Sequence, residues 1–458
     1  MNDNNVWKSL VDIFLPEGLA LRPYQYGGSK FLFERSRALI ASEPGTGKTI
    51  MLIVAANIVA STRCDAGTRI LILCPKSMRL KWLEEIEKWS QKKWPMTWEV
   101  HNWERLLNSK HEATLFQSYD IVIGDESHEC IKSPDYEKKQ PKRRDGTRPP
   151  PKETRCGVFM LKVVPLATRV WIATATPASV SGLDYFTTLR LLLPSIFESW
   201  SAWDFKKEFC EEKEDRWAQS GKKYEGFRNT KILKEIFQKV AIKHRKAEVL
   251  PDLPPKVYTN IEVEIDPKIA ALHLDLDREM VAELILEGKP LPGHLAHVLQ
   301  ATALAKIDAL VEMLNGYPLT ENVVVFAWHK IVIYEIEKRY LKELKPGEAP
   351  PAVLTGDVND ENLRKQMVDK FQRKEIQKFL ANMKSGGVGI TLTAAHTAIY
   401  IELPHSPIPF LQSEDRVHRI GSEADKIHII RVVAKNTIDA EMFEKLDRRI
   451  KTIREVGV

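Results

Sequence analysis

The chain has 458 residues with a formal net charge of +6, and its 43% hydrophobic content is typical of a soluble globular protein of two or three domains. No apolar run reaches the ~18 residues that a membrane-spanning helix needs, and the first residues lack the pattern of a signal peptide. Five cysteines without a CxxC pair favour reduced cytosolic thiols over a disulfide framework or a zinc site.

Short apolar runs alternate with helical patterns along the whole chain, which indicates an α/β fold with parallel sheets. Runs that are apolar throughout are typical of strands buried on both faces. In the first half, the runs that we expect to be strands are residues 38–41, 70–74, 121–124 and 170–173. In the second half, they are residues 323–327, 352–354, 378–381, 397–401 and 427–433.

The first chemical motif is a glycine-rich turn between the strand that ends at Ala41 and a helix that starts at Thr49. It consists of Glu43, Pro44, Gly45, Thr46, Gly47, Lys48 and Thr49. In such a turn the backbone N–H groups face phosphate oxygens, the lysine neutralises the β- and γ-phosphates, and the threonine hydroxyl binds Mg²⁺. We interpret it as a nucleotide site, with a plain glycine-rich turn and an exposed lysine as the alternative.

The expected strand 121–124 is followed directly by a second motif, Asp125-Glu126-Ser127-His128. Adjacent carboxylates at a strand end can divide the work, with Asp125 in the Mg²⁺ shell and Glu126 polarising the attacking water. An isolated pair of this kind is usually a solvated turn, but the phosphate loop upstream favours a hydrolase. His128 is expected to be structural or coupling rather than catalytic.

Two further stretches of the first half have a distinctive composition. Residues 132–155 hold nine Lys and Arg against four Asp and Glu, and they include the Pro-rich run 141–151. This segment suits either a clamp on a polyanion or a solvated loop. A Trp-rich stretch includes Trp82 and Trp89, which share one face of a helix, so we expect helix packing rather than base stacking.

The Pro-rich segment 251–262 is expected to be an extended linker between an N-terminal domain, residues 1–250, and a C-terminal domain, residues 263–458. Two largely helical stretches, residues 184–246 and 267–314, do not fit simple βα alternation. We expect each of them to be a helical insertion, one in each domain.

The second half contains another glycine-rich turn at residues 384–393, followed by the segment from Gln412 to Gly421. Arg416 and Arg419 are spaced to share one face of a helix. Two guanidinium groups suit a polyphosphate with developing charge, as arginine fingers do, whereas the alternative is a pair of surface salt bridges. The phosphate loop in the first half favours the fingers.

Taken in order, these motifs resemble those of the Swi/Snf-type double-stranded DNA translocases of helicase superfamily two. The resemblance covers nearly the whole chain, including its helical stretches and its linker. The matching segments are Leu21–Gln25, Glu43–Thr49, Ile72–Ser77, Asp125–His128, Thr174–Pro177, Phe326–His329, Ser385–Thr393 and Gln412–Gly421.

The resemblance implies two RecA-like P-loop lobes with ATP and Mg²⁺ between them. The residues implied in catalysis are Lys48, Asp125, Glu126, Arg416 and Arg419, and Thr49 and Asp125 would hold the metal. Further ATP contacts would come from Arg22, Gln25, residues 43–49 and Gly389. Coupling would involve His128, Thr174, Thr176 and Gln412. Contacts to DNA would come from Lys76, Ser77, Lys384, Ser385 and Thr391.

The chain departs from the family pattern in a few places. Ala175 replaces a glycine, and Ser422 follows Gly421 where the family usually has glutamine. The segments Asp125–His128 and Ala327–Lys330 resemble the fork-remodelling or annealing-helicase branch. Because the flanking modules usual in nuclear remodellers are absent, we expect the cytoplasm of a bacterial or phage-infected cell rather than a nucleus.

Three functions remain open on this basis. The leading one is an ATPase that translocates on double-stranded DNA, forked or branched DNA included, without necessarily separating the strands. The second is a helicase that separates strands of DNA or RNA. The third is an ATP-dependent switch or scaffold without motor activity, which the nearly complete set of catalytic residues disfavours.

Overall fold

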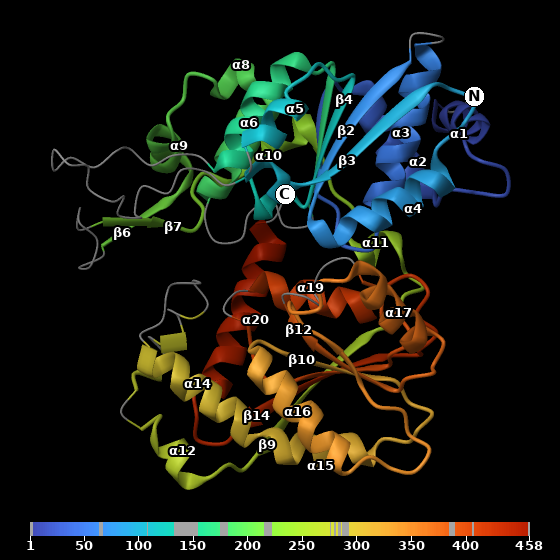
Figure 1. Cartoon of the computed structure of the whole chain (residues 1–458). Coiled ribbons are helices and arrows are strands. Elements are labelled where there is room, and N and C mark those ends of the chain that lie inside the picture. Colours follow the sequence, from blue (N-terminus) through green and yellow to red (C-terminus); the bar gives the residue numbers. More distant parts are fainter. Residues whose placement is uncertain are drawn as a thin grey trace. The chain divides into compact units, whose positions relative to one another are not determined.

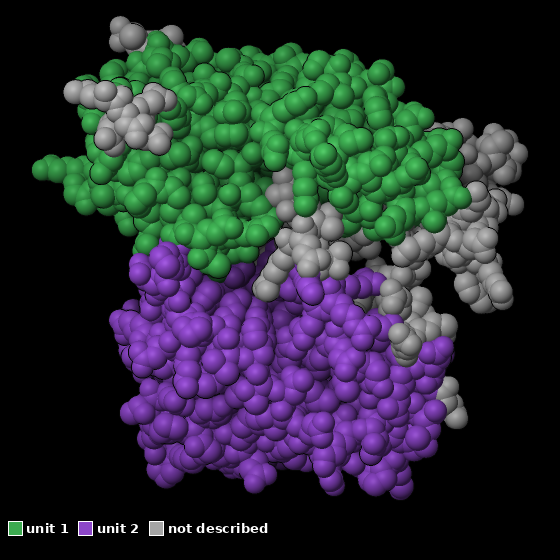
Figure 2. Space-filling model, turned by 180° about the vertical axis from the view of Figure 1, so that it is seen from behind, with its two compact units in different colours: residues 1–249, 455–458 green, residues 250–454 purple. Residues whose placement is uncertain are grey.

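The computed structural model describes residues 3–63, 67–107, 109–131, 154–174, 182–214, 222–274, 276–278, 281, 282, 285, 293–383, 390–404 and 407–456. The chain divides into two compact units between Val249 and Leu250, coloured separately in Figure 2, and the last residues from Glu455 belong to unit 1. Within the described residues no helix combines the length and the apolar character that crossing a membrane requires.

Unit 1 is built on a six-stranded parallel sheet with strand order β3-β2-β4-β5-β1-β8 (Figure 1). Its strands are β1 Arg37–Ile40, β2 Thr68–Cys74, β3 Met96–Asn102, β4 Ile121–Asp125, β5 Arg169–Ala173 and β8 Ala241–Ile242, and β6 Glu211–Glu214 and β7 Lys222–Glu225 form a separate hairpin. Its helices are α1 Asp3–Ile13, α2 Pro23–Glu34, α3 Lys48–Thr62, α4 Arg79–Trp89, α5 Ser109–Leu115, α6 Arg155–Val163, α7 Phe186–Leu192, α8 Pro194–Phe197, α9 Ala202–Phe209, α10 Thr230–Val240 and α11 Lys246–Val249.

Strands β1, β2, β4 and β5 of this sheet are buried on both faces, which explains their apolar runs. In β2, Ile70 and Ile72 pack into a core cluster with helices α1 to α4. The alternating residues Leu71 and Leu73 pack into a second cluster with α6, α7, α9 and α10. Helix α3 is buried along most of its length, so it lies in the core rather than on the surface.

Unit 2 contains a second six-stranded parallel sheet, with strand order β11-β12-β10-β13-β14-β9. Its strands are β9 Lys256–Val263, β10 Val323–Ala327, β11 Ala352–Leu354, β12 Lys378–Asn382, β13 Thr397–Tyr400 and β14 Ile427–Ala434. Its helices are α12 Pro267–Ala271, α14 Gly293–Ala305, α15 Ile307–Gly316, α16 Lys330–Lys342, α17 Glu361–Gln372, α19 Pro407–Val417 and α20 Asp439–Val456.

The α/β fold with parallel sheets agrees with the expectation from the sequence, and every expected strand corresponds to a strand of the structure. Three sheet strands, β3, β8 and β9, were not expected. Strand β3 is only partly buried, so its sequence, Met96–Asn102, lacks the apolar run that marks a buried strand. Strand β8 has two residues, too few for any sequence pattern.

The expected linker 251–262 is wrong from Lys256 onward. Residues Lys256–Val263 form β9, an edge strand that pairs in parallel with β14 along its whole length. Most of its side chains are exposed, so the segment has the polar composition of a linker although its backbone is paired. The stretch 184–246 is also not helical throughout, because it contains strands β6, β7 and β8 as well as helices.

Candidate active site

The phosphate loop lies between β1 and the N-terminus of α3, as the sequence indicates. Gly45 and Gly47 both have φ of +79°, a left-handed conformation that favours glycine. A Cβ atom on Gly47 would lie 2.3 Å from Nε2 of Gln25, so this position also lacks room for a side chain. The loop therefore presents the backbone of α3's first turn, whose free N–H groups suit an anion.

Helix α2 holds this loop through two side chains. Nε2 of Gln25 donates to the carbonyl oxygen of Thr46 at 3.3 Å, and the hydroxyl of Tyr24 donates to the same oxygen at 2.8 Å. Gln25 also accepts from the backbone N–H of Arg22 at 2.9 Å, while the Arg22 side chain is exposed. Gln25, one of the expected ATP contacts, thus lies against the phosphate loop.

Lys48 is folded against its own loop. Its ammonium donates to the carbonyl oxygens of Ser42 at 2.9 Å and Glu43 at 3.4 Å, and the side chain is buried. Thr46 stabilises the same turn, because its hydroxyl donates to the carbonyl oxygen of Glu43 at 2.8 Å. The Lys48 ammonium is thus held within the phosphate loop, partly by the loop's own carbonyl groups.

Asp125 lies at the carboxyl end of β4 and is almost completely buried. Its Oδ2 accepts from the indole N–H of Trp82 at 2.8 Å, and its Oδ1 accepts from the backbone N–H of Glu126 at 3.0 Å. The indole N–H of Trp103 donates to its carbonyl oxygen at 2.9 Å. Burial and the neighbouring Glu126 carboxylate raise the pKa of Asp125 to about 6, against the opposing effects of the Trp82 hydrogen bond and the Lys48 charge.

Glu126 is held in an uncommon backbone conformation next to Asp125. Its φ of +46° lies in the left-handed region, where a residue other than glycine is strained. Its Oε2 is buried and has no hydrogen-bond partner among the residues that the structure describes. This oxygen lies 3.4 Å from Nδ1 of His128, which in turn lies 2.8 Å from the hydroxyl of Thr174. The structure thus brings together Glu126, His128 and Thr174, three of the residues expected to act or couple.

These residues lie on one edge of the sheet because β1, β5 and β4 are neighbours. The phosphate loop follows β1, Thr174 follows β5, and Asp125 ends β4. The carboxyl edge of a parallel sheet is where α/β proteins bind ligands.

The donor set on this edge fits Mg²⁺. The candidate ligands are the Asp125 carboxylate and the Thr49 hydroxyl, both hard oxygen donors, with the unbonded Oε2 of Glu126 nearby. The described residues contain no group of three or more His, Cys, Asp and Glu that could hold a metal alone. A Mg²⁺ ion held by one or two protein oxygens and by the substrate's phosphates agrees with both observations.

Unit 2 brings Arg416 and Arg419 against residues within the second glycine-rich turn, 384–393. Nη1 of Arg416 donates to the carbonyl oxygen of Ile390 at 3.4 Å, and Nη1 of Arg419 donates to the hydroxyl of Thr391 at 3.3 Å. Arg416 is buried and Arg419 is half-buried. Gln412, also expected to couple, is buried on α19.

The expectation that both arginines share one face of a helix is wrong. Helix α19 ends at Val417, so Arg416 is helical and Arg419 lies beyond the end. The backbone carbonyl of Arg416 accepts from the N–H of Leu392 at 2.9 Å, a bond to another segment where a continuing helix would bond Ile420. Both arginines therefore contact residues 390–391 because the backbone of Arg416 is bonded to the neighbouring Leu392, and not because they share a helical face.

Among the expected DNA contacts, Lys76 is exposed and Ser77 is half-buried in the short 3₁₀-helix Lys76–Met78 that precedes α4. Thr391 is half-buried in unit 2. Several predictions fall outside the described residues: those for Thr176, Lys384, Ser385 and Gly389, and nearly all of the basic segment 132–155.

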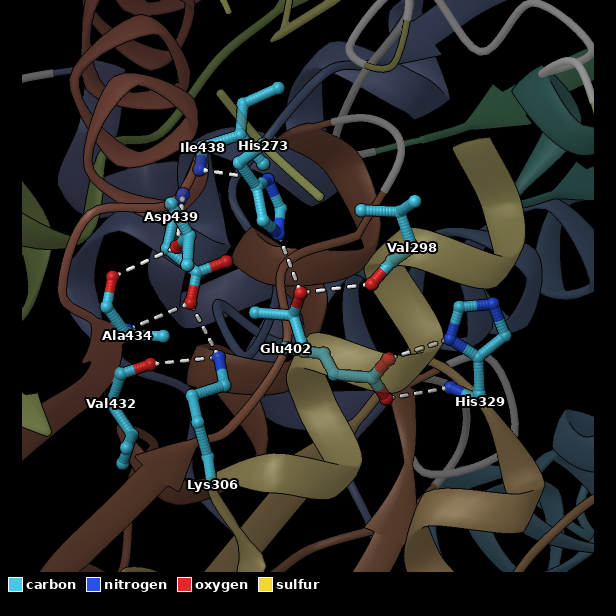
Figure 3. A network of polar contacts seen from close by, with 11 residues as sticks. His273, Val298, Lys306, His329, Glu402, Val432, Ala434, Ile438 and Asp439 are labelled. Carbon is cyan, nitrogen blue, oxygen red and sulfur yellow. Dashed lines mark hydrogen bonds and ion pairs between the residues drawn. The ribbon is translucent and has the colours of Figure 1, made fainter. Parts of the chain in front are cut away.

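Some residues next to the site were not expected from the sequence. Ser42 lies 2.8 Å from Nδ1 of His244, and the Glu43 carboxylate accepts from the backbone N–H of Lys246 at 2.7 Å. The only sequence signal is the basic run 243–246. In unit 2, Nδ1 of His329 lies 2.6 Å from the buried Glu402 carboxylate, which also accepts from the N–H of residues 328 and 329 at 2.9 Å (Figure 3).

The chain matches two family models. That of the SNF2-related domain matches residues 24–140 and 158–289, more than half of the chain. That of the helicase conserved C-terminal domain matches residues 305–421.

Curated relatives match along nearly the whole chain. The chain is 27% identical over 485 residues to the human DNA annealing helicase and endonuclease ZRANB3, covering 96% of this chain and 41% of that protein. It is 27% identical over 462 residues to the Xenopus tropicalis SWI/SNF-related matrix-associated actin-dependent regulator of chromatin subfamily A-like protein 1, covering 96% of this chain and 45% of that protein. The chain thus spans less than half of either relative.

Among solved structures, the chain is similar to the Sulfolobus solfataricus SWI2/SNF2 ATPase core in complex with dsDNA. The sequence identity is 17% and the TM-score is 0.39, and the match covers 96% of this chain and 93% of that one.

Proposed function

The chain belongs to the SNF2-related family of helicase-like ATPases, and we propose that it is a motor that hydrolyses ATP in order to move along double-stranded DNA. The observation that carries the proposal is the arrangement at the carboxyl edge of unit 1's sheet. The phosphate loop lies on this edge. The buried carboxylate of Asp125 and the strained Glu126 lie on the same edge, two strands away.

In this proposal each part of ATP hydrolysis is assigned to a small set of residues. The loop's N–H groups and Lys48 bind the phosphates. Thr49 and Asp125 would hold a Mg²⁺ ion, which would supply further positive charge for the phosphates. Glu126 orients the attacking water and accepts its proton. Its Oε2 has no hydrogen-bond partner among the described residues, and His128 lies 3.4 Å from it. Arg416 and Arg419 of unit 2 stabilise the charge that develops on the transferred phosphoryl group.

Support for DNA as the partner comes from the relatives, since the human relative is named a DNA annealing helicase. Lys76, Ser77 and Thr391 are the described residues proposed to contact its phosphates. Contacts of this kind are independent of sequence and weaken with salt. Forked or branched DNA belongs to the same proposal, because the relative's name describes annealing of strands.

Two substitutions test the active site. Glu126→Gln should retain ATP binding and lose turnover, because the amide cannot accept the water's proton. Lys48→Ala should lose both, because the phosphates lose their cation. Glu104→Gln, an exposed position in the same unit, is the matched control and should behave as wild type. Full ATPase activity in either active-site variant would show that the assigned site is wrong.

A further inference from the structure

The last residues of unit 1 are bonded to the start of the phosphate loop. Strand β8 pairs with β1, and the N–H of Ala41 donates to the carbonyl oxygen of Ile242 at 2.9 Å. One step further, the N–H of Glu43 donates to the carbonyl oxygen of His244 at 3.1 Å, and the N–H of His244 donates to the Ser42 hydroxyl at 3.1 Å. The N–H of Lys246 also donates to the Glu43 carboxylate. We call these bonds between residues 241–246 and the start of the phosphate loop the first anchor.

The first residues of unit 2 are bonded to the helix that carries Arg416. Nζ of Lys256 donates to Oε2 of Glu414 at 2.7 Å, and the hydroxyl of Tyr258 donates to the same oxygen at 3.1 Å. Nε2 of His418, just after the helix, donates to the carbonyl oxygen of Pro254 at 2.8 Å. This second anchor therefore contacts α19 and its C-terminal end, on both sides of Arg416.

The second anchor contains a buried carboxylate paired with its counter-ion. Glu414 is fully buried, and its other carboxylate oxygen has no hydrogen-bond partner among the described residues. Burial lowers the pKa of Lys256, but the neighbouring Glu414 and Asp415 carboxylates outweigh this effect and raise it above its ordinary value. Removing the cation alone would leave a buried charge without its counter-ion, which is strongly destabilising.

Only residues 247–253 separate the two anchors along the chain. Resting on the proposed ATP hydrolysis, we propose that the segment from Ile242 to Tyr258 is a positioning element that couples the phosphate loop to the arginine helix α19. One end of the segment is fixed to the loop that holds the phosphates, and the other end is fixed to the helix that carries an arginine finger. A displacement of the phosphate loop would therefore be transmitted to α19 through this short segment, and a displacement of α19 would be transmitted to the loop.

The anchor on α19 is tested by substitutions at Lys256, Glu414 and Tyr258. Lys256→Met should lower the DNA-stimulated kcat on the order of 10- to 100-fold while the KM for ATP stays near wild type, because the arginine is misplaced and the loop is not. Lys256→Arg keeps the charge and should restore most of the rate. Tyr258→Phe, which leaves no charge unpaired, should give a smaller fall in the same direction.

A double substitution separates positioning from stability. In Lys256→Met with Glu414→Gln, no buried charge is left unpaired, so thermal stability should recover relative to the single variant. The rate should stay low, because the anchor is still missing. If the rate recovers together with stability, the pair is only structural and the inference is overturned.

The matched control is a second buried ion pair in the same unit. Nζ of Lys306 donates to Asp439 at 2.7 Å and to the carbonyl oxygen of Val432 at 3.0 Å (Figure 3). Asp439 belongs to α20 and Val432 to β14, so neither of these two partners lies on α19. Lys306→Met should lower stability to a comparable extent and leave kcat near wild type, measured well below its melting temperature. An equal loss of kcat in this control would overturn the inference.

Lengthening the connection tests the coupling itself. A four-residue Gly-Ser insertion between Val249 and Leu250 leaves both anchors intact, and it should retain ATP binding while DNA stimulation is lost. The same insertion after Gly347, an exposed turn of unit 2, should have no effect. Unchanged DNA stimulation in the first insertion contradicts the inference, whereas a wild-type protein without ATPase activity contradicts the proposed function instead.

Discussion

The indole N–H of Trp82 lies 2.8 Å from Oδ2 of Asp125, so a side chain of α4 fixes the carboxylate at the end of β4. Helix α4 starts directly after Lys76–Met78, the segment proposed to contact DNA. Movement of that segment would therefore act on the proposed metal ligand through one buried, inflexible side chain.

Trp82→Phe should weaken the use of Mg²⁺, because phenylalanine keeps the ring and removes the N–H that orients the carboxylate. Hydrogen bonds to charged groups contribute about 1.5–3 kcal/mol, so we expect roughly a tenfold rise in the Mg²⁺ concentration for half-maximal ATP binding. The measurement is a titration of nucleotide binding with Mg²⁺. Trp89→Phe is the control on the same helix, because the Trp89 indole N–H is buried without a partner among the described residues. Equal titrations for both variants would contradict a specific role of Trp82.

The raised pKa of Asp125 should appear in the stability of the protein without nucleotide or metal. The value rises from 3.8 to about 6 on folding, so the native state binds more protons than the unfolded state between these limits. This contribution is present below pH 3.8 and is lost as the pH rises through about 6. It amounts to at most about 3 kcal/mol.

Asp125→Asn isolates the contribution of Asp125 to the free energy of unfolding, because the wild type and the variant share all other titrating groups. Chemical unfolding from pH 8 to pH 5 should show wild type gaining stability relative to the variant as the pH falls. Parallel curves for the two proteins would mean that Asp125 titrates near its ordinary pKa in the folded state.

Thr174→Val should slow hydrolysis with little change in ATP affinity. Valine keeps the shape of the buried threonine but removes the hydroxyl that lies 2.8 Å from Nδ1 of His128, so His128 no longer positions Glu126. We expect a fall in kcat of about tenfold, the rate equivalent of one hydrogen bond. Thr68→Val is the control, because its buried hydroxyl has no partner among the described residues, and its kcat should not change.

The strands that carry the site could be predicted because they are buried on both faces, and their residues are apolar without interruption. The phosphate loop and Asp125 follow such strands, so their place at one sheet edge also followed from the sequence. Strand β9 could not be predicted in this way. It is an edge strand with most side chains exposed, and only its backbone pairing with β14 distinguishes it from a linker.

Contacts between distant segments were beyond the sequence patterns. Trp82 and Trp89 share one face of α4 and are both buried, as the helical pattern predicted. Only the three-dimensional contact shows that one indole bonds Asp125 and the other has no such partner. In the same way, the carbonyl of Arg416 accepts from the N–H of Leu392, and α19 ends before Arg419. The residues around Val417 contain no sequence signal that predicts this end of the helix.

Lys76→Ala should weaken binding to duplex DNA by a similar factor for every sequence. If Lys76 neutralises one phosphate, the slope of log K against log salt should become less steep by about 0.9. The measurement is DNA affinity over a range of salt concentrations. Lys92→Ala is a comparison at an exposed lysine in unit 1 that pairs with Glu87, and it should leave the slope unchanged. An unchanged slope for Lys76→Ala would remove this residue from the DNA contacts.

Whether duplex DNA drives ATP turnover can be measured as the ATPase rate of the whole chain with matched lengths of duplex DNA, forked DNA, single-stranded DNA and RNA. We expect stronger stimulation by duplex or forked DNA than by single strands or RNA, and no stimulation in Glu126→Gln. Greater stimulation by RNA or by single-stranded DNA would contradict a duplex translocase and favour a strand-separating helicase.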